Sequence, residues 1–400
     1  VFDGLTAMKN AFHHFPAVRE LLAALIIGIG LIGLSGCAEY LPANADTPAA
    51  RVDDRELIAL VPDTESQLAT LAAAERRNYA LVDVTELGEL DLIMLTFLLP
   101  SGVTGAEGIV ALEGEVPSAT VGVNHAYRLQ SVEDGTSELN YANQLIAWPD
   151  GACQAQVPVG LIDSGVDVTV PSVEAARVIA RDFSEDPFSD LQHGTELASV
   201  ISDRSRLTDV VIYSANVLSE TPDAGVAAGA DDMIRALDWL ASEDVRVINI
   251  ALAGPFNKLL NLAVTQATND GAIIVAAAGN AGPRAAPLYP AAFDDVIGVT
   301  AIDAAGTVYR NAVQGPQIDI AAPGVDVLVD LGGEPRFVSG TSIATPFVLS
   351  RIIADPSLAR ARDAASVLQA LRTTSVDLGA EGRDTVFGLG LLNADGRCAG

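Results

Sequence analysis

The sequence predicts an α/β protein whose larger part is a doubly wound, mostly parallel sheet with helices on both faces. From residue 156 onward, short apolar runs alternate with segments of helical period. The runs show little of the in/out alternation of a half-exposed sheet, as expected for parallel strands covered on both sides. Ligands of such sheets bind at the carboxyl ends of the strands, so functional residues are expected there.

Length and composition fit a globular protein with more than one domain. Half of the 400 residues are apolar, which is enough for a sizeable core. Acidic residues number 52 and basic residues 23, for a net charge of −29. This charge argues against nucleic acid and anionic lipid surfaces as partners, because both repel an acidic protein.

An uncharged apolar segment near the start, LLAALIIGIGLIGL at 21–34, is typical of a secretory signal. It is shorter than the roughly 20 residues needed to span a bilayer. The LSGC that follows resembles the lipobox of bacterial lipoproteins, whose cysteine, here Cys37, is lipidated. We predict a signal peptide over 1–37 and an exported protein of the periplasm or cell envelope, anchored to the membrane before processing. An uncleaved membrane anchor and an ordinary signal peptide are the alternatives.

Residues 38–55, polar and proline-containing, are predicted to form a tether. Residues 56–130 predict the order β-α-β-β-α-β, which is typical of a small ferredoxin-like α+β domain. Asp63 is the expected N-cap of its first helix, and ATVGVNHAYRL is its expected last strand. Residues 131–155 lack a clear period and are predicted to be a linker and processing region. Export would allow Cys153 and Cys398 to pair, with two free thiols as the alternative.

Within the larger domain, 156–400, three polar residues adjoin predicted strands or helices. Asp163 ends the run VPVGLID, and Asn280 follows the run AIIVAAAG. His193 precedes a helical segment and is the only histidine between 156 and 400. If imidazole acts as a base in this domain, His193 is that base. Taken singly, the Asp and Asn motifs are more typical of ordinary turns.

The run SGTSIATPF begins a predicted helix, and Thr341 or Ser342 could serve only as its N-cap. A serine hydroxyl becomes a nucleophile when a base lies within hydrogen-bond reach and a carboxylate orients that base. Asp163, His193 and Ser342 supply these three groups. The Asn280 side chain and the Ser342 backbone N–H could stabilise the resulting oxyanion.

The motifs LIDSGVD, HGTELA, AAAGNAGP and SGTSIATPF, in this order, resemble those of the subtilisin-like serine proteases, or subtilases. The resemblance covers roughly residues 156–396. It implies a subtilisin-like fold and a serine endopeptidase acting on peptide or protein substrates through an acyl-enzyme. It makes Asp163, His193 and Ser342 the triad, with Asn280 and Ser342 at the oxyanion hole. A catalytically silent lipoprotein that binds peptides in its cleft is the alternative.

The resemblance also assigns the substrate-binding strand, where the family usually has Ser-Leu-Gly and this chain has NIALAGP. Ala251, Leu252, Ala253 and Gly254 are therefore expected to pair with the substrate backbone. In HGTELAS, Glu196 and Ser199 stand where the family often has a histidine and a glycine. Subtilases often bind calcium, but no dense oxygen-ligand loop is found, so no cofactor or metal ligand is assigned.

Residues 56–130 resemble the subtilase propeptide, which assists folding and inhibits the enzyme. An unrelated binding domain is the alternative. Self-cleavage between about 128 and 150 would then separate the catalytic domain from a lipid anchor at Cys37.

Overall fold

The computed structural model describes residues 55–129, 132–133, 141–184, 188–221, 225–332 and 335–398. The predicted signal peptide with Cys37 and nearly all of the predicted tether lie outside these ranges. Within them, every helix is too short or too polar to cross a bilayer.

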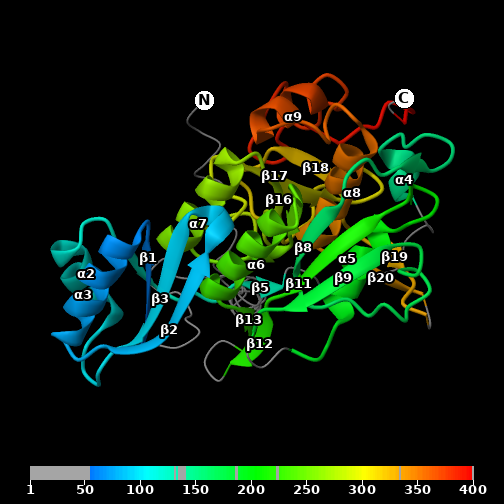
Figure 1. Ribbon diagram of the computed structural model, residues 1–400. Helices are drawn as coiled ribbons and strands as arrows, with labels where there is room; N and C mark the ends of the chain where they lie inside the picture. The colour runs from blue at the N-terminus through cyan, green and yellow to red at the C-terminus, as the bar shows by residue number, and fades with distance from the viewer. Residues whose placement is uncertain are drawn as a thin grey trace, which may run out of the picture. The chain divides into compact units, whose positions relative to one another are not determined.

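The N-terminal domain has the predicted order β-α-β-β-α-β, and its sheet is antiparallel with the strand order β2-β3-β1-β4 (Figure 1). One face of this sheet packs on both helices. Asp63 caps the first helix by accepting a hydrogen bond from Ser66 N. The elements are β1 (Glu56–Val61), α2 (Thr64–Glu75), β2 (Ala80–Leu87), η1 (Gly88–Leu90), β3 (Leu92–Leu98), α3 (Gly105–Glu115) and β4 (Thr120–Val123).

The C-terminal domain is built on a parallel sheet, seven-stranded in the described residues, with the order β18-β17-β16-β14-β8-β11-β9. This confirms the predicted doubly wound sheet. Four of its inner strands, β8, β14, β16 and β17, are buried along their whole length. The edge strand β9 is largely exposed, so it has no apolar run that would have predicted it. The strands are β8 (Val159–Asp163), β9 (Arg177–Asp182), β11 (Val211–Asn216), β14 (Val247–Ile250), β16 (Ile273–Ala277), β17 (Val296–Ile302) and β18 (Ile320–Pro323).

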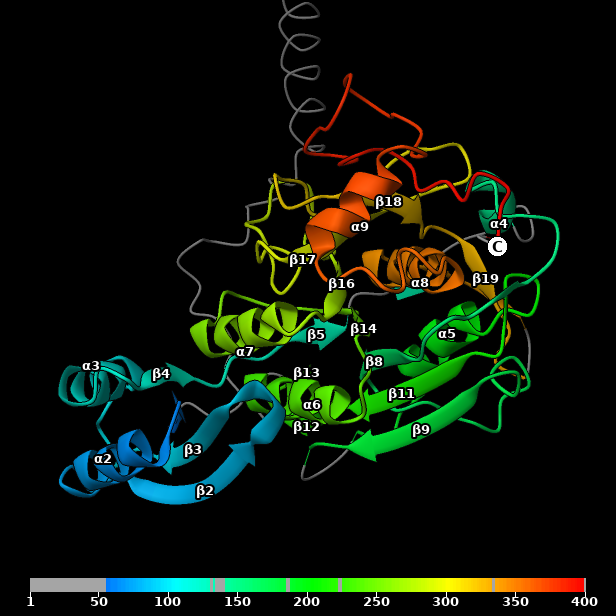
Figure 2. The same cartoon turned by 45° about the horizontal axis from the view of Figure 1, so that its top comes forward.

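Helices cover both faces of this sheet (Figure 2). On one face, α5 (Gln192–Ile201) and α8 (Thr341–Ala354) share an apolar core with the strands. On the other face, α6 (Ala230–Ser242) and α7 (Lys258–Asn269) share a second core. Neighbouring residues of one strand enter different cores, as with Ile274 and Val275 of β16. This explains why the buried strands read as continuous apolar runs.

Shorter elements complete the fold around the edges of the sheet. They are β5 (Arg128–Leu129), β6 (Val132–Glu133), α4 (Ala142–Leu145), β7 (Cys153–Gln154), β10 (Leu207–Thr208), β12 (Leu218–Thr221), β13 (Gly225–Ala228), β15 (Leu252–Ala253), β19 (Val327–Val329), β20 (Arg336–Ser339) and α9 (Ala364–Leu371).

Residues 141–155 differ from the predicted linker, because they pack into the C-terminal domain. Tyr141, Ile146 and Trp148 are buried in the core that contains α5 and α8. Their spacing follows neither a helical nor a strand period, which is why the sequence did not indicate burial. The next residues form β7, which pairs with β10.

A disulfide joins Cys153 of β7 to Cys398, with an S–S distance of 2.05 Å. The two cysteines are 245 residues apart in sequence. A cross-link that closes so long a loop typically stabilises a fold by about 2–5 kcal/mol. The bridge therefore ties the start of the C-terminal domain to its end.

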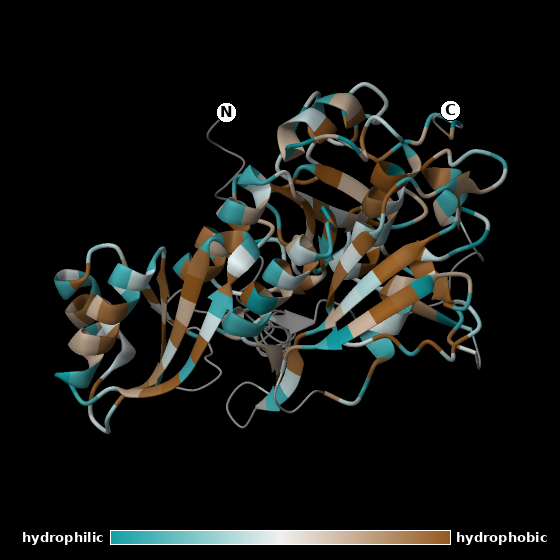
Figure 3. Ribbon diagram, in the orientation of Figure 1, coloured by the Kyte–Doolittle hydropathy of each residue, from teal (hydrophilic) through white to brown (hydrophobic). Residues whose placement is uncertain are grey.

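The N-terminal domain packs on α6 and α7 through the second face of its sheet. Ile58, Leu60 and Met94 belong to the same buried cluster as the apolar residues of these helices, and Figure 3 shows the apolar colouring of β3. The predicted strand over 119–129 is broken at Asn124, whose side-chain oxygen accepts a hydrogen bond from Ala230 N at 2.6 Å. Asn124 thus caps α6 of the other domain, and the chain leaves its own sheet there.

Candidate active site

Three polar side chains meet at the carboxyl end of the inner strand β8: those of Asp163, His193 and Ser342. Asp163 is the last residue of β8, and the other two are the second residues of α5 and α8. His193 Nδ1 lies 2.6 Å from Asp163 Oδ1, and His193 Nε2 lies 3.2 Å from Ser342 Oγ. All three are at most 4% exposed. The structure therefore brings together a hydroxyl, an imidazole and a carboxylate in the arrangement that activates a nucleophile.

A close contact between the end of β8 and the start of α5 sets the position of His193. Ser164 Oγ accepts a hydrogen bond from Gly194 N at 2.8 Å. A Cβ atom at position 194 would lie 2.3 Å from Ser164 O, so a glycine is needed for this approach. Ser164 was not singled out in the sequence, although its position directly after Asp163 is the signal that could have identified it.

Neither Thr341 nor Ser342 is the N-cap of α8, because the helix begins at Thr341 after Gly340 and has no side-chain cap. The alternative in which Ser342 serves only as a cap is therefore wrong. Pro346 lacks the N–H that would bond Ser342 O in the helix. Thr345 Oγ1 donates to Ser342 O instead, at 2.8 Å, so the first turn is supported despite the proline.

Asn280 is held by Thr341, a residue whose sequence context indicates only a possible helix cap. Asn280 Oδ1 accepts hydrogen bonds from Thr341 N at 3.1 Å and from Thr341 Oγ1 at 3.0 Å. Thr341 Oγ1 also accepts from Gly279 N at 3.0 Å. Gly279 has a φ of +96°, and a Cβ there would lie 2.4 Å from Leu288, so this turn requires glycine.

These contacts orient the Asn280 carboxamide through its oxygen, with the amide N–H₂ group on the opposite branch. The start of α8 adds backbone N–H groups that lack intrahelical acceptors and the positive end of the helix dipole. An anion that forms next to Ser342 Oγ would be stabilised by both features.

The electrostatic surroundings of His193 favour its protonated form. Burial is the largest influence and lowers its pKa, but Asp163, by charge and hydrogen bond, and Glu196, by charge, outweigh it. The pKa of His193 is therefore raised above 6.5. An imidazole with a raised pKa is a stronger base for the Ser342 proton.

The predicted substrate-binding strand pairs with a segment of the same chain. In β15, Leu252 and Ala253 pair antiparallel with Leu129 and Arg128 of β5. Gly254, at the end of the predicted set 251–254, instead forms a bridge to Tyr289.

On its other side, this segment contacts β13. Tyr127 and Ala228 exchange two backbone hydrogen bonds, of 2.9 and 2.8 Å. Residues 127–129 therefore lie between β13 and β15 as an added strand. Further along the chain, Val132 and Glu133 of β6 pair with β20, the strand that leads to Ser342.

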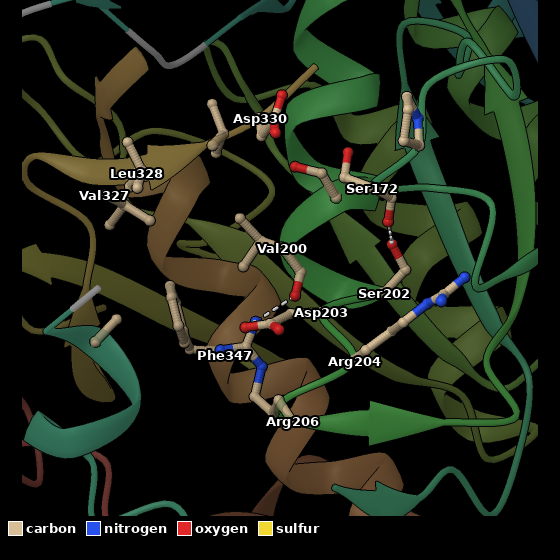
Figure 4. Close-up of a pocket in the computed structure, with 14 residues that line it drawn as sticks. Ser172, Val200, Ser202, Asp203, Arg204, Arg206, Val327, Leu328, Asp330 and Phe347 are labelled. Carbon is tan, nitrogen blue, oxygen red and sulfur yellow. Dashed lines mark hydrogen bonds and ion pairs between the residues drawn. The ribbon is translucent and has the colours of Figure 1, made fainter. Parts of the chain in front are cut away.

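No group of three or more His, Cys, Asp or Glu side chains in the described ranges is placed to hold a metal ion. A separate cavity of about 270 Å³ lies at the other end of α5 from His193 (Figure 4). It is lined by residues of α5 and β19 and by Phe347 of α8. The buried Arg206 lines it as well, with its guanidinium 4.5 Å from the centre of the Phe347 ring. No residue of the triad lines this cavity.

The α/β fold and the geometry of this site are those expected of a serine-type peptidase. The model of the subtilase family matches residues 154–390, which is more than half of the chain. The chain belongs to the subtilase family, whose class is that of serine-type endopeptidases.

Several characterised proteins are similar to this chain. Halolysin from Haloferax mediterranei is 27% identical over 387 residues, covering 90% of this chain and 72% of halolysin. Subtilisin from Bacillus pumilus is 30% identical over 61% of this chain and 91% of the subtilisin. The minor extracellular protease Epr of Bacillus subtilis is 27% identical over 62% of this chain, but the chain spans only 39% of Epr.

Among solved structures, fervidolysin from Fervidobacterium pennivorans, a keratinolytic enzyme related to subtilisin, matches with a TM-score of 0.67. The identity is 18%, and the match covers 86% of this chain and 60% of fervidolysin. This likeness supports the subtilisin-like fold.

We predict that kcat/KM for a peptide substrate falls at low pH with an apparent pKa above 6.5, because His193 must be neutral to accept a proton. Protonated His193 favours the folded state, and this contribution is lost as pH rises through the raised pKa. Asp163→Asn should lower the apparent pKa and reduce kcat by about 10⁴-fold. A pH profile of hydrolysis tests this, and a wild-type midpoint below 6.5 would contradict it.

We also predict that Asn280→Ala lowers kcat by about 10²–10³-fold, a magnitude that comes from subtilisin itself. KM should change little, because the side chain would act on the oxyanion and not on the bound substrate. Steady-state kinetics of the variant, with circular dichroism to verify folding, measure both effects. Unchanged turnover would exclude Asn280 as the oxyanion donor.

Proposed function

We propose that this chain hydrolyses internal peptide bonds through an acyl-enzyme, with Asp163, His193 and Ser342 as the catalytic triad. The observation that carries this proposal is the continuous line of buried contacts from Asp163 Oδ1 through His193 to Ser342 Oγ, at 2.6 and 3.2 Å. A cleft that only binds peptides would not need a carboxylate, an imidazole and a hydroxyl aligned within hydrogen-bond distance of one another. No observation in the described residues favours the catalytically silent alternative.

In the proposed reaction, His193 Nε2 accepts the Ser342 proton while Ser342 Oγ attacks the carbonyl carbon of the scissile bond. The carbonyl oxygen becomes an oxyanion and accepts hydrogen bonds from Asn280 Nδ2 and Ser342 N. Collapse of this intermediate breaks the C–N bond, and His193 gives its proton to the leaving amine. Water, activated by His193, then releases the acyl group from Ser342.

Peptide and protein substrates fit this site because its strand edges recognise extended backbone. β15 and β13 hold residues 127–129 by main-chain pairing, and a substrate would use the same edges after this segment leaves. Tyr127 is 0% exposed in this position, and its hydroxyl donates to Pro255 O at 3.3 Å.

We propose that the N-terminal domain is a propeptide that inhibits the site by presenting this segment to it. Support comes from its contacts with the catalytic domain: Asn124 caps α6, and Asn257, the N-cap of α7, donates to Val123 O at 2.9 Å. An ion pair between Lys258 and Glu113 adds to them. An unrelated binding domain would not be expected to place the segment that follows it, residues 127–129, along the substrate-binding strand.

The same strands support self-processing. β5 ends at Leu129 on the substrate strand, and β6 begins at Val132 on the strand that leads to Ser342. We infer that the bond cut lies between Leu129 and Val132, within the wider range of 128–150 expected from the sequence.

We predict that Ser342→Ala leaves the N-terminal domain covalently joined to the catalytic domain and abolishes labelling by a fluorophosphonate probe. The wild-type chain should yield a fragment whose new N-terminus lies between residues 130 and 132. Loss of a triad serine costs about 10⁶-fold in kcat, a figure known for subtilisin. Purified protein analysed by N-terminal sequencing tests this. Processing of the Ser342→Ala variant at the same bond, without another protease, would refute self-cleavage.

We further propose that processing releases the catalytic domain from the cell envelope, because Cys37 precedes the cut and the triad follows it. After cleavage, only non-covalent contacts with the N-terminal domain would hold the catalytic domain. The disulfide does not oppose release, since Cys153 and Cys398 both follow the cut.

We therefore predict that the wild-type catalytic fragment appears in the soluble fraction, whereas Ser342→Ala remains with membranes. Fractionation after mild removal of the N-terminal domain measures this. A Cys37→Ser control should not be lipidated, so mass spectrometry of the N-terminus identifies the anchor. A processed fragment that stays in detergent-only fractions would disprove release.

A further inference from the structure

Glu196 is a buried carboxylate one helical turn after the proposed catalytic base. It lies in α5, three residues after His193, and is 1% exposed. Its Oε1 accepts hydrogen bonds from Arg336 Nη2 and from Gln192 Nε2, the latter at 3.2 Å. A buried carboxylate is costly unless it is paired, so Arg336 makes an ionised Glu196 compatible with this position.

The partner of Glu196 comes from the strand that leads to the nucleophile. Arg336 is the first residue of β20, which ends at Ser339 and is followed by Gly340 and α8. The ion pair therefore joins the helix that carries His193 to the strand that positions Ser342. The two residues are 140 positions apart in sequence.

Charges from three elements bear on this part of the site. Asp163 reaches His193 from β8, Glu196 acts on it from α5, and Arg336 faces Glu196 from β20. The pKa of Glu196 is raised, because burial, the largest influence, outweighs the lowering effects of His193, Arg336 and Gln192. The ion pair with Arg336 thus favours the charged form of Glu196 beside the imidazole.

We propose that Glu196, held by Arg336, is a second carboxylate for the catalytic histidine and acts as a positioning residue. It stabilises the imidazolium that forms when His193 takes the Ser342 proton, and it fixes α5 against β20 so that Nε2 faces Oγ. This inference rests on the proposed function. It also gives a role to Glu196 at the position where this chain departs from the usual family motif.

The test compares pH profiles of kcat/KM for the wild-type chain and Glu196→Gln, which keeps the shape and removes the charge. The acid midpoint should fall by about 0.5–1 pH unit. The kcat should fall by about 3–10-fold. KM should be unchanged, because the hydrogen-bond partners of Glu196 are Arg336 and Gln192, which belong to β20 and α5 and not to the strands that would bind the substrate. Arg336→Lys keeps a cation opposite Glu196 and should retain a midpoint close to the wild-type value.

Asp319→Asn is the matched control, because Asp319 is also buried and pairs with an arginine, Arg383, at 2.7 Å. It should lower thermal stability without moving the pH midpoint. If Glu196→Gln behaves in the same way, the pair is only structural and the proposal fails. If Glu196→Gln does not fold, Glu196→Gln/Arg336→Met removes both charges of this pair together, and it should lower the midpoint too.

A second measurement separates this proposal from the proposed function. In the inactive Ser342→Ala chain, NMR titration of the His193 ring reports its pKa without any turnover. A lower pKa in Glu196→Gln/Ser342→Ala supports the role of Glu196 even if hydrolysis is never observed. An unchanged pKa there overturns the role, even if the wild-type chain is an active peptidase.

Discussion

The hydrogen bond between Asp163 Oδ1 and His193 Nδ1 is the interaction on which the rest of the site depends. Because the Nδ1–H group donates a hydrogen bond to the carboxylate, Nε2 is the acceptor that faces Ser342. The contact also joins the end of β8 to the start of α5, so it fixes a strand and a helix at once. Both partners are buried, which strengthens the bond by excluding water.

The start of α8 combines two requirements in one place. A nucleophile must lie within reach of its base, and the oxyanion that it generates must meet donors already in position. Ser342 satisfies the first requirement as the second residue of the helix. Thr341 serves the second by holding Asn280 through its backbone N–H and its hydroxyl. In the proposed mechanism, the tripeptide from Gly340 to Ser342 thus positions both the attacking hydroxyl and the donor that stabilises the oxyanion.

Much of the sheet could be predicted, because strands that are buried on both faces consist of consecutive apolar residues that can be recognised in the sequence. The inner strands are continuous apolar runs, and the segments of helical period that alternate with them form helices such as α6. His193 stood out as the only histidine of its domain. The break at Asn124 and the bond from Glu196 to Arg336 could not be predicted, because each depends on a partner more than 100 residues away. The sequence around a polar residue does not indicate which distant group will form a hydrogen bond with its side chain.

The placement of residues 127–129 between β13 and β15 has a kinetic consequence. If the N-terminal domain is the inhibitor that we propose, this segment competes with substrates in the intact chain at an effective concentration set by its tether and not by the amount of protein. Cutting the tether turns the competition into an ordinary bimolecular equilibrium, whose outcome depends on dilution. At the high local concentration of a cell envelope, the N-terminal domain would then remain bound to the cleft. Dilution into a large volume would dissociate it and start the activity of the enzyme.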